Sequence, residues 1–275
     1  MSDNMTISRL EGMKSRGEKI SALTAYDYTF ARLVDAAGAD IVLVGDSLGM
    51  VFNGEENTLR VTVDDIAYHV KAVRKGIGRA LLVADMPFLS CHLGMDKALE
   101  SAGRLIFEGA EAVKIEGCDG LLEIIGKMLT AGIPVMGHIG LTPQSIHKFG
   151  GFKIQGRREE AARRLIDEAL KLEQAGVFSI VLECVPEDLA ARITEKLNIP
   201  TIGIGAGPAC DGQILVTADL LGLQTEFKPK FVKKYADLAS VVKKAVGSYI
   251  EEIKTGAFPD EQHCYQSSPK HLKAI

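Results

Sequence analysis

The sequence lacks tryptophan altogether, and aromatic residues make up only 6% of its 275 positions. Cysteine is scarce too, and no two cysteines form a C-x-x-C pair. An odd number of unpaired cysteines indicates free thiols in a reducing compartment, not a disulfide framework. The five cysteines are Cys91, Cys118, Cys184, Cys210 and Cys264.

Long apolar runs are also missing. The longest stretch without Asp, Glu, Lys or Arg extends from Met128 to His147, and glycine, proline and histidine interrupt it. Such a stretch does not predict a membrane span. The first residues have mixed charge and no apolar segment, so we expect no signal peptide. The sequence therefore predicts a cytoplasmic protein with no membrane partner.

An excess of basic residues is absent as well. Lys and Arg number 32 against 36 Asp and Glu, which gives a formal net charge of −4. Because the basic residues are spread along the chain, the sequence predicts no nucleic-acid partner. Hydrophobic residues at 47% and charged residues at 25% are ordinary for a globular protein. A chain of this length suits one barrel or two small domains.

What the sequence does contain is an alternation of short apolar runs and helical patterns. The run Ile41–Gly45, bounded by Asp40 and Asp46, is typical of a strand buried on both faces. The expected strands are Ile20–Ala25, Ile41–Gly45, Leu81–Ala84, Glu111–Gly117, Pro134–His138, Ser179–Leu182, Pro200–Ile204 and Ile214–Thr217. The expected helices include Ile7–Arg16, Asp27–Ala37, Leu121–Leu129, Arg157–Ala175, Glu187–Leu197 and Val232–Ile253, and Asp96 is expected to cap another.

Eight strands that alternate with helices over about 250 residues predict an α/β fold, a single (β/α)₈ barrel. A doubly wound open sheet is the competing architecture, with its polar residues gathered at one switch point. The barrel is favoured because polar residues follow five different strands. We expect residues 1–255 to form one catalytic barrel domain and residues 256–275 to form a C-terminal tail.

The strands end in residues that a buried strand does not normally contain. Four apolar runs end in acids and a fifth ends in histidine: Asp46, Asp85, Glu116, Glu183 and His138. Lys114 precedes Glu116 by two positions, so both side chains point to the same face of a strand. A plain Lys–Glu ion pair is the alternative. Because buried charge is costly unless it is paired or bound to a metal, the joint pattern indicates an active site.

Asp46, Asp85 and Glu116 offer hard oxygen ligands, with no Cys and His set nearby. This choice of donors suits Mg²⁺ better than Zn²⁺. Each acid taken alone is more often a helix cap or a loop residue than a ligand. Their shared position after neighbouring strands favours the metal site.

The other polar residues suggest roles toward an anionic substrate. Ser47 follows Asp46, and its hydroxyl or amide could hold a carboxylate, although a simple turn residue is the alternative. Lys114 can neutralise the substrate's negative charge. His138 can donate to a ketone oxygen or only orient its neighbours. Glu183 has no cationic partner in its own strand and is the natural base, with His138 as the rival.

One connection is unusually long. The segment Ile139–Gly156 follows the histidine strand and contains Gly150, Gly151 and Gly156. Loops longer than about twelve residues in a compact domain are usually functional, often as lids. Cys91 and His92 lie in the loop after the third strand and could approach the same site.

Seven segments in chain order resemble the ketopantoate hydroxymethyltransferase family, and together they cover roughly residues 5 to 255. The segments are Thr24–Tyr28 (TAYDY), Val44–Gly49 (VGDSLG), Ala84–Phe88 (ADMPF), Val113–Gly117 (VKIEG), Gly137–Ser145 (GHIGLTPQS), Gly203–Gly207 (GIGAG) and Asp211–Val216 (DGQILV).

The resemblance implies a barrel of the phosphoenolpyruvate mutase-like type and a homo-oligomer, usually a decamer. It implies transfer of a one-carbon unit from 5,10-methylenetetrahydrofolate to 3-methyl-2-oxobutanoate, which gives 2-dehydropantoate in pantothenate biosynthesis. The family's metal ligands fall on Asp46, Asp85 and Glu116, and its proton acceptor falls on Glu183. Its substrate contacts fall on Asp46, Ser47, Asp85 and Lys114.

Two other functions remain possible from the sequence. One is a Mg²⁺-dependent oxoacid lyase or mutase of the same barrel superfamily. Such enzymes often have a cysteine in a mobile loop, and Ile139–Gly156 has none. The other is a non-catalytic metal-binding barrel, which is disfavoured because every polar group that the chemistry needs is present.

Overall fold

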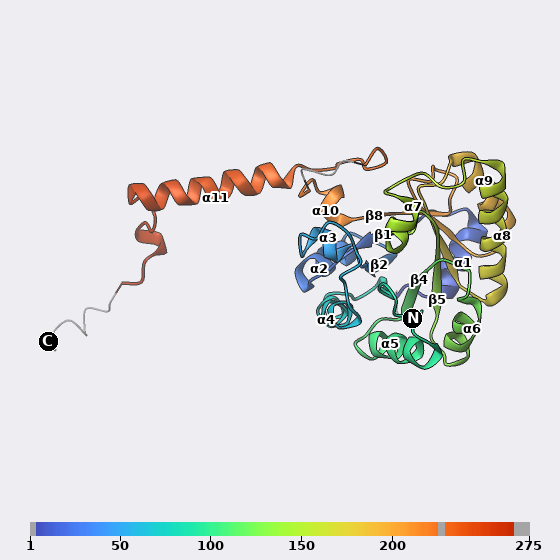
Figure 1. Ribbon diagram of the computed structural model, residues 1–275. Coiled ribbons are helices and arrows are strands. Elements are labelled where there is room, and N and C mark those ends of the chain that lie inside the picture. Colours follow the sequence, from blue (N-terminus) through green and yellow to red (C-terminus); the bar gives the residue numbers. More distant parts are fainter. Residues whose placement is uncertain (1–3, 225–228, 267–275) are drawn as a thin grey trace. The chain divides into compact units, whose positions relative to one another are not determined.

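The structure is a computed structural model, and it describes residues 4–224 and 229–266 of the chain. Eight parallel strands pair in sequence order and close into a barrel, with β1 next to β8 (Figure 1). This closure confirms the predicted (β/α)₈ barrel and excludes the open sheet. The strands are β1 (Ile20–Thr24), β2 (Ile41–Val44), β3 (Leu81–Asp85), β4 (Ala112–Glu116), β5 (Val135–Gly140), β6 (Ser179–Glu183), β7 (Thr201–Ile204) and β8 (Gly212–Leu215).

The strands are apolar because both of their faces are buried. In β2, Ile41 and Leu43 belong to the core inside the barrel, whereas Val42 and Val44 pack in the layer between the sheet and the helices. Side chains alternate between the two faces of a strand, so a barrel strand needs apolar residues at nearly every position. This requirement explains why the strands could be located from sequence alone.

Helices surround the sheet, and a short N-terminal helix closes its amino end (Figure 1). The surrounding helices are α2 (Tyr28–Ala36), α4 (Val63–Arg74), α5 (Met95–Phe107), α6 (Leu122–Thr130), α8 (Glu159–Ala175) and α9 (Glu187–Lys196). Helix α1 (Ile7–Arg16) has the predicted bounds, and its Leu10 is completely buried in the inner core. Thr62 and Asp65 form the capping box that starts α4.

Several predicted boundaries were wrong for identifiable local reasons. Strand β8 begins two residues before the expected run, because Gly212 and Gln213 pair with Ile20 and Ser21 of β1. Helix α5 begins at Met95 after Gly94, so Asp96 lies in its first turn and is not its cap. The expected loops contain short helices α3 (Leu48–Val51), η1 (Pro143–Ser145) and α7 (Ile146–Phe149).

The last predicted helix also starts later than expected. Helix α11 extends from Leu238 to Thr255, and the Asp237 side chain accepts a hydrogen bond from the Ser240 amide at its start. A further turn, η2 (Glu261–His263), follows it. Part of the expected C-terminal tail, residues 267–275, lies outside the described residues.

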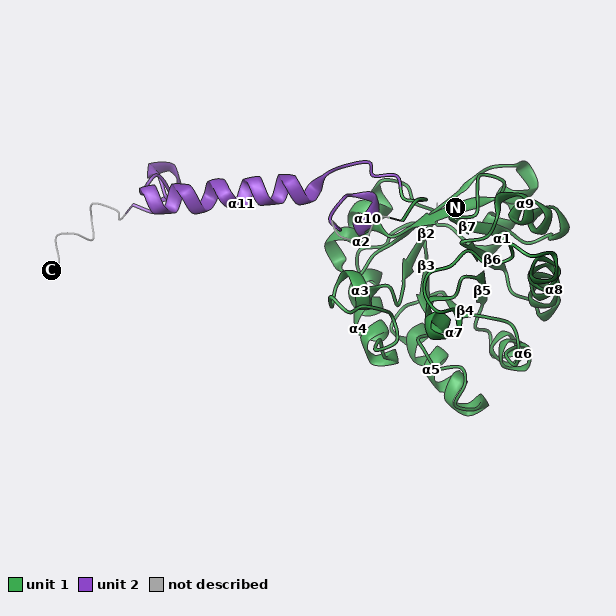
Figure 2. Ribbon diagram, turned by 45° about the horizontal axis from the view of Figure 1, so that its top comes forward, with its two compact units in different colours: residues 1–217, 229–232 green, residues 218–228, 233–275 purple. Residues whose placement is uncertain are grey.

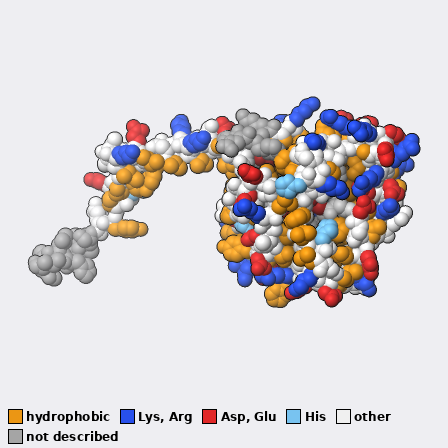
Figure 3. All heavy atoms as spheres, viewed as in Figure 1, with side chains coloured by type: hydrophobic (Ala, Val, Ile, Leu, Met, Phe, Trp, Pro, Cys, Tyr) orange, Lys and Arg blue, Asp and Glu red, His pale blue; other side chains and the backbone are white. Residues whose placement is uncertain are grey.

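The chain forms two compact units (Figure 2). The first comprises Met1–Thr217 and Pro229–Val232, and it contains the barrel. The second comprises Ala218–Lys228 and Lys233–Ile275, with α11 and most of α10 (Thr217–Leu220). No residue of α11 is buried, and apolar side chains gather along it in Figure 3. The expected domain boundary at residue 255 remains a prediction.

Within the described segments, no helix is both long and apolar enough to cross a membrane.

Candidate active site

The predicted site residues converge at the carboxyl end of the barrel, and strand register brings them there. Asp85 of β3 pairs with Lys114 of β4, and Glu116 of β4 pairs with His138 of β5. These four side chains are almost wholly buried. Asp46 lies two residues after the end of β2, and Glu183 is the last residue of β6, so the cluster extends across five neighbouring strands.

Lys114 lies at the centre of this cluster. Its Nζ atom is 2.9 Å from Asp85 Oδ1, 4.0 Å from Glu116 Oε1 and 3.2 Å from His138 Nδ1. Burial favours the neutral amine, but the attraction of Asp85, Glu116 and Asp46 outweighs burial and raises the pKa of Lys114. The lysine is therefore a permanent cation. It lies on the same face of β4 as Glu116, as predicted from their spacing of two residues.

The carboxylates crowd one another. The Asp46 amide donates a hydrogen bond to Asp85 Oδ2 at 2.9 Å, which holds these two acids together. Burial, and then repulsion from Asp85 and Glu116, raises the pKa of Asp46 well above its usual range. The approach requires glycine at position 45, because a Cβ there would lie 2.9 Å from Ser47 Oγ and 3.3 Å from Asp85 Oδ2.

Glu116, His138 and Glu183 form a row across β4, β5 and β6. His138 Nδ1 is 3.3 Å from Glu116 Oε1, and His138 Nε2 is 3.3 Å from Glu183 Oε2. Burial raises the pKa of both glutamates, whereas burial and the nearby Lys114 lower the pKa of His138. Because the lysine ammonium faces Nδ1, a neutral imidazole with its proton on Nε2 fits this arrangement.

Ser47 lies beside the carboxylates and has a partner of its own. Its hydroxyl is 2.8 Å from the hydroxyl of Tyr26, a buried residue in the loop after β1. Burial raises the pKa of Tyr26, so the phenol stays protonated. Tyr26 is fixed in turn from α4, since His69 Nδ1 lies 2.5 Å from the Tyr26 carbonyl oxygen. Tyr26 therefore fixes the orientation of the Ser47 hydroxyl.

Gln144 is the residue that sequence reasoning missed. It lies in η1, in the long connection after β5, and its backbone amide donates to Glu116 Oε2 at 3.0 Å. Its side-chain Nε2 donates to Asp46 Oδ2 and to the Met86 carbonyl, both at 2.9 Å. One residue therefore links groups that follow β2, β3 and β4. An amide just beyond a strand that ends in functional residues was the available signal.

The donor set fits a hard divalent cation. Three buried carboxylates share one lysine, and Asp85 Oδ1 and Glu116 Oε1 are buried without an aligned hydrogen-bond partner. Over residues 4–224 and 229–266, no three acid, His or Cys side chains form a ready-made metal-binding group. Mg²⁺ usually binds through one or two carboxylates together with water or substrate oxygens, so Asp46, Asp85 and Glu116 suit it without a closed shell.

The two weaker candidates differ in position. Cys91 is buried, and burial raises the pKa of its thiol to about 12, which makes it a poor nucleophile. His92 lines a cavity beside Glu116. Only the histidine has access to the site.

Solved structures with the same architecture include a phosphonopyruvate hydrolase, with a TM-score of 0.61 and 12% sequence identity. That match covers 96% of this chain and 93% of the other. A 2,3-dimethylmalate lyase of the phosphoenolpyruvate mutase/isocitrate lyase superfamily gives a TM-score of 0.60 at 15% identity, over 99% of this chain and 94% of the other. These likenesses show that the chain shares the (β/α)₈ barrel fold of those structures.

Sequence relatives are much closer. A 3-methyl-2-oxobutanoate hydroxymethyltransferase from Trichlorobacter lovleyi is 55% identical over 266 residues, which cover 96% of this chain and 100% of that protein. An enzyme of the same name from Clostridium botulinum is 53% identical over 271 residues, 98% of each chain. The family model described as ketopantoate hydroxymethyltransferase matches residues 4–261. The chain therefore belongs to the ketopantoate hydroxymethyltransferase family.

Proposed function

We propose that this protein is a 3-methyl-2-oxobutanoate hydroxymethyltransferase. It moves a one-carbon unit from 5,10-methylenetetrahydrofolate to 3-methyl-2-oxobutanoate and gives 2-dehydropantoate, a step of pantothenate biosynthesis. Family membership over residues 4–261 supports the activity. The observation that carries the proposal is the position of Lys114, a buried cation 2.9 Å from Asp85 and flanked by groups suited to metal binding and proton transfer.

The oxoacid binds through its negative charge. Lys114 is a permanent cation inside the barrel, and it offers ammonium protons to the carboxylate or keto oxygen of the substrate. Ser47, held by Tyr26 at 2.8 Å, offers a second donor beside it. A charged hydrogen bond of this kind contributes about 1.5–3 kcal/mol to binding. Asp46 and Asp85 lie next to these donors and complete the substrate contacts.

Asp46, Asp85 and Glu116 would hold Mg²⁺. When bound there, the ion supplies a Lewis acid that makes the C–H bond next to the substrate's keto group more acidic. Gln144 fixes two of these carboxylates by hydrogen bonds, at 2.9 Å to Asp46 and 3.0 Å to Glu116. The protein thus keeps its acids in place through neutral donors that add no competing charge.

Glu183 takes the proton from C3 of the oxoacid. Its side chain is 14% exposed, and burial of the rest raises its pKa, which makes it a better base than a fully exposed glutamate. His138 is less suited, because its Nδ1 atom faces the Lys114 ammonium and its pKa is lowered. In this assignment, His138 orients Glu183 and keeps the proton on Nε2.

The reaction balances with these groups. The C3–H electron pair becomes the nucleophile and forms a C–C bond to the donor's methylene carbon. The two C–N bonds of that carbon are replaced by this C–C bond and by one C–O bond from water. The proton from C3 and one from water then appear on the two nitrogens of tetrahydrofolate.

The assay that tests the proposal follows loss of 3-methyl-2-oxobutanoate as a function of added 5,10-methylenetetrahydrofolate. Transfer that requires both compounds is expected. Consumption of the oxoacid without folate would instead indicate a lyase or mutase of the same superfamily. No turnover of the oxoacid under either condition, in folded protein supplied with Mg²⁺, would contradict both activities.

We further propose that the enzyme is cytoplasmic and forms a homo-oligomer, a decamer if it follows its family. Five free cysteines suit a reducing compartment. Exposed apolar side chains on α11, among them Val242, Tyr249 and Ile253, suit burial in an assembly. Light scattering on the purified protein measures the number of subunits, and a monomer at micromolar concentration would contradict the assembly.

A further inference from the structure

A cavity of about 360 Å³ opens beside the carboxylate cluster. Glu116 and Gln144 line it, so it is continuous with the catalytic groups. Its other walls come from the loop after β3, the loop after β4, the long connection after β5 and the first half of α8. The volume is typical of a pocket for a drug-sized molecule and exceeds what a small branched oxoacid would fill.

The walls of this cavity expose apolar surface to solvent. Phe88 and Leu89 lie at its edge with 40% and 44% of their surface accessible, and Phe149 lines the side formed by α7. Leu89 has a backbone φ of 64°, which is unfavourable for a residue with a branched side chain. Exposed apolar groups around one cavity, one of them on strained backbone, are typical of a ligand surface.

The charged residues of the cavity differ in how they are paired. Arg164 is bound to Asp119 and Glu168, at 2.8 Å and 2.7 Å, so its charge is already neutralised. Lys148 on α7 also lines the cavity, and it makes no ion pair with any other residue that the structure describes. The cavity therefore combines an apolar wall with one cation available to an anionic ligand.

We propose that this cavity is the binding site of the one-carbon donor, with the donor's flat ring system against Phe88, Leu89 and Phe149 and its anionic tail near Lys148. The inference rests on the proposed function, because it assumes that a second, larger reactant must deliver its methylene group to the enolate. Glu116 and Gln144 line the cavity and belong to the catalytic cluster, so a methylene group bound in the cavity can reach the enolate. The long connection after β5 then acts as one wall of the donor site.

Filling the cavity tests the proposal. Ala161 is a lining residue on α8 with a small side chain, and Ala161→Phe places a ring in the cavity. Glu160→Phe, on the exposed side of the same turn, is the matched control. Two readouts separate the sites: deuterium exchange at C3 of the oxoacid without folate, and equilibrium binding of tetrahydrofolate followed by calorimetry.

We expect Ala161→Phe to weaken tetrahydrofolate binding by about tenfold or more and to leave the exchange rate within about twofold of wild type. Glu160→Phe should change neither. Unchanged tetrahydrofolate binding in Ala161→Phe, or an exchange rate that falls in parallel with it, would overturn the proposal. A wild-type protein that exchanges C3 but does not transfer the one-carbon unit would contradict the proposed function instead.

Lys148 provides a second test that adds no bulk. Lys148→Gln should raise the KM for the folate donor by about twofold to fivefold, as expected for one exposed charge pair. The difference should shrink at high salt, because screening weakens exposed charge interactions. Lys153→Gln, an exposed lysine of the same connection outside the cavity lining, is the control. Equal effects of the two substitutions would show that the donor's anionic tail does not bind near Lys148.

Discussion

The two ends of this barrel contain the same kinds of charged residue but differ in how these residues are hydrogen-bonded. At the amino end, acids precede the strands and are enclosed by donors. At the carboxyl end, acids lie at or just after the strand ends, and several of their oxygens make no well-aligned hydrogen bond. The two ends also differ in burial, since the side chains of Lys14 and Asp211 are each 15% exposed, whereas those of Lys114 and Asp85 are 5% and 3% exposed.

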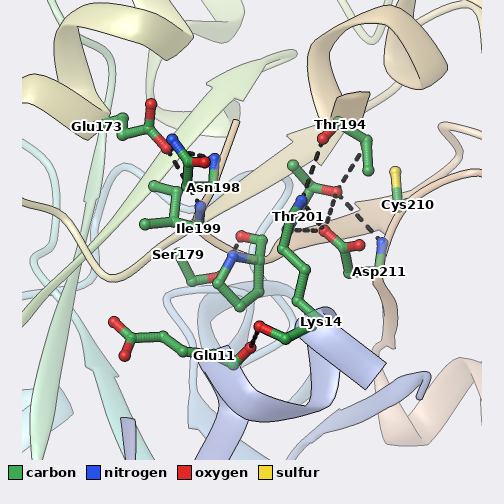
Figure 4. Close-up of polar contacts among 12 residues, drawn as sticks. Glu11, Lys14, Glu173, Ser179, Thr194, Asn198, Ile199, Thr201, Cys210 and Asp211 are labelled. Atoms are coloured by element: carbon green, nitrogen blue, oxygen red, sulfur yellow. Dashed lines mark hydrogen bonds and ion pairs between the residues drawn. The ribbon is translucent and has the colours of Figure 1, made fainter. Parts of the chain in front are cut away.

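Asp211, which precedes β8, shows the amino-end arrangement (Figure 4). One oxygen accepts hydrogen bonds from the Thr201 amide at 2.8 Å and the Thr201 hydroxyl at 3.1 Å, and from Lys14 Nζ at 2.8 Å. Lys14 also donates to the Thr194 carbonyl at 3.1 Å. Each charge is thus met by fixed partners that join α1 to the last two strands. Such a cluster stabilises the fold.

The carboxyl end lacks this saturation. Glu116 Oε1, Asp85 Oδ1 and His138 Nε2 are buried and make no well-aligned hydrogen bond, although Lys114 Nζ lies 2.9 Å from Asp85 Oδ1 and His138 Nε2 lies 3.3 Å from Glu183 Oε2. Burial raises the pKa of Asp46, Glu116 and Glu183. Leaving buried polar atoms unsatisfied costs about 1–3 kcal/mol for each group. A fold that accepts this cost at one end and avoids it at the other reserves that end for a metal and a substrate.

The largest effect that separates the two ends should come from the metal. A strong chelator should abolish transfer, and added Mg²⁺ should restore it. Asp85→Ala should lower activity by about 10³-fold, which corresponds to several kcal/mol of transition-state stabilisation. Metal content measured by plasma emission should fall in the same variant. Full activity in metal-stripped protein, or unchanged metal content in Asp85→Ala, would count decisively against this role for the carboxyl end.

The next effect concerns proton removal. Glu183→Gln keeps the shape of the side chain and removes the base, so C3 deuterium exchange in the oxoacid should slow by about 10²- to 10³-fold. Oxoacid binding should survive, because Glu183 does not hold the substrate's charge in this scheme. His138→Asn is the matched variant. If exchange is normal in Glu183→Gln but lost in His138→Asn, the base is His138.

Two lysines give the most direct comparison of the ends. Lys114→Ala should weaken oxoacid binding by about 1.5–3 kcal/mol, the range for a charged hydrogen bond, and should leave the fold intact. Lys14→Ala should leave oxoacid binding unchanged and lower the free energy of unfolding by about 1–3 kcal/mol, because Asp211 loses a charged donor. Urea unfolding and calorimetric titration measure both quantities. Unchanged oxoacid affinity in Lys114→Ala would return Lys114 to a structural ion pair.

The sequence alone was sufficient to predict the barrel and to bring the charged cluster together. Strands such as β2 are apolar at every position, and parallel strands align their carboxyl ends, so the neighbourhood of Asp85 and Lys114 followed from order alone. The sequence could not show which hydrogen-bond partners each acid has. Asp40 and Asp46 bound the predicted strand Ile41–Gly45 on its two sides, yet Asp40 is held by Ser21 and Arg79, whereas Asp46 is repelled by Asp85.

The distant contacts of residues in long connections were also beyond sequence reasoning. Gln144 reaches Asp46 over 98 positions, and no local pattern encodes that distance. Helix α11 was placed too early because apolar periodicity continues through Tyr235, whereas the observed start depends on the Asp237 cap. Periodicity reports which face of a helix is apolar, and the cap decides where the helix begins.

The smallest expected effect is a pH-dependent change in the free energy of unfolding at the amino end. Asp35 lies at the amino end, where its carboxylate accepts hydrogen bonds from the amides of Gly78, Arg79 and Ala80 just before β3. Burial alone would raise the pKa of Asp35, but these three amides, led by Ala80, outweigh it and lower the pKa. At neutral pH, Asp35→Asn should therefore reduce the free energy of unfolding by about 1–2 kcal/mol, because an amide accepts these bonds less well.

The sign of the pH dependence follows from the lowered pKa of Asp35. A carboxyl group that ionises more readily in the folded state adds stability above its ordinary pKa of 3.8, and that stability is lost as the pH falls through the folded value. The difference in unfolding free energy between wild type and Asp35→Asn should thus be constant from pH 7 to about pH 5 and should shrink below about pH 4. Glu11→Gln removes the same charge from an exposed position on α1 and controls for net charge. A difference that stays constant down to pH 2.5, or one that Glu11→Gln reproduces, would show that the amides near β3 do not hold the Asp35 charge.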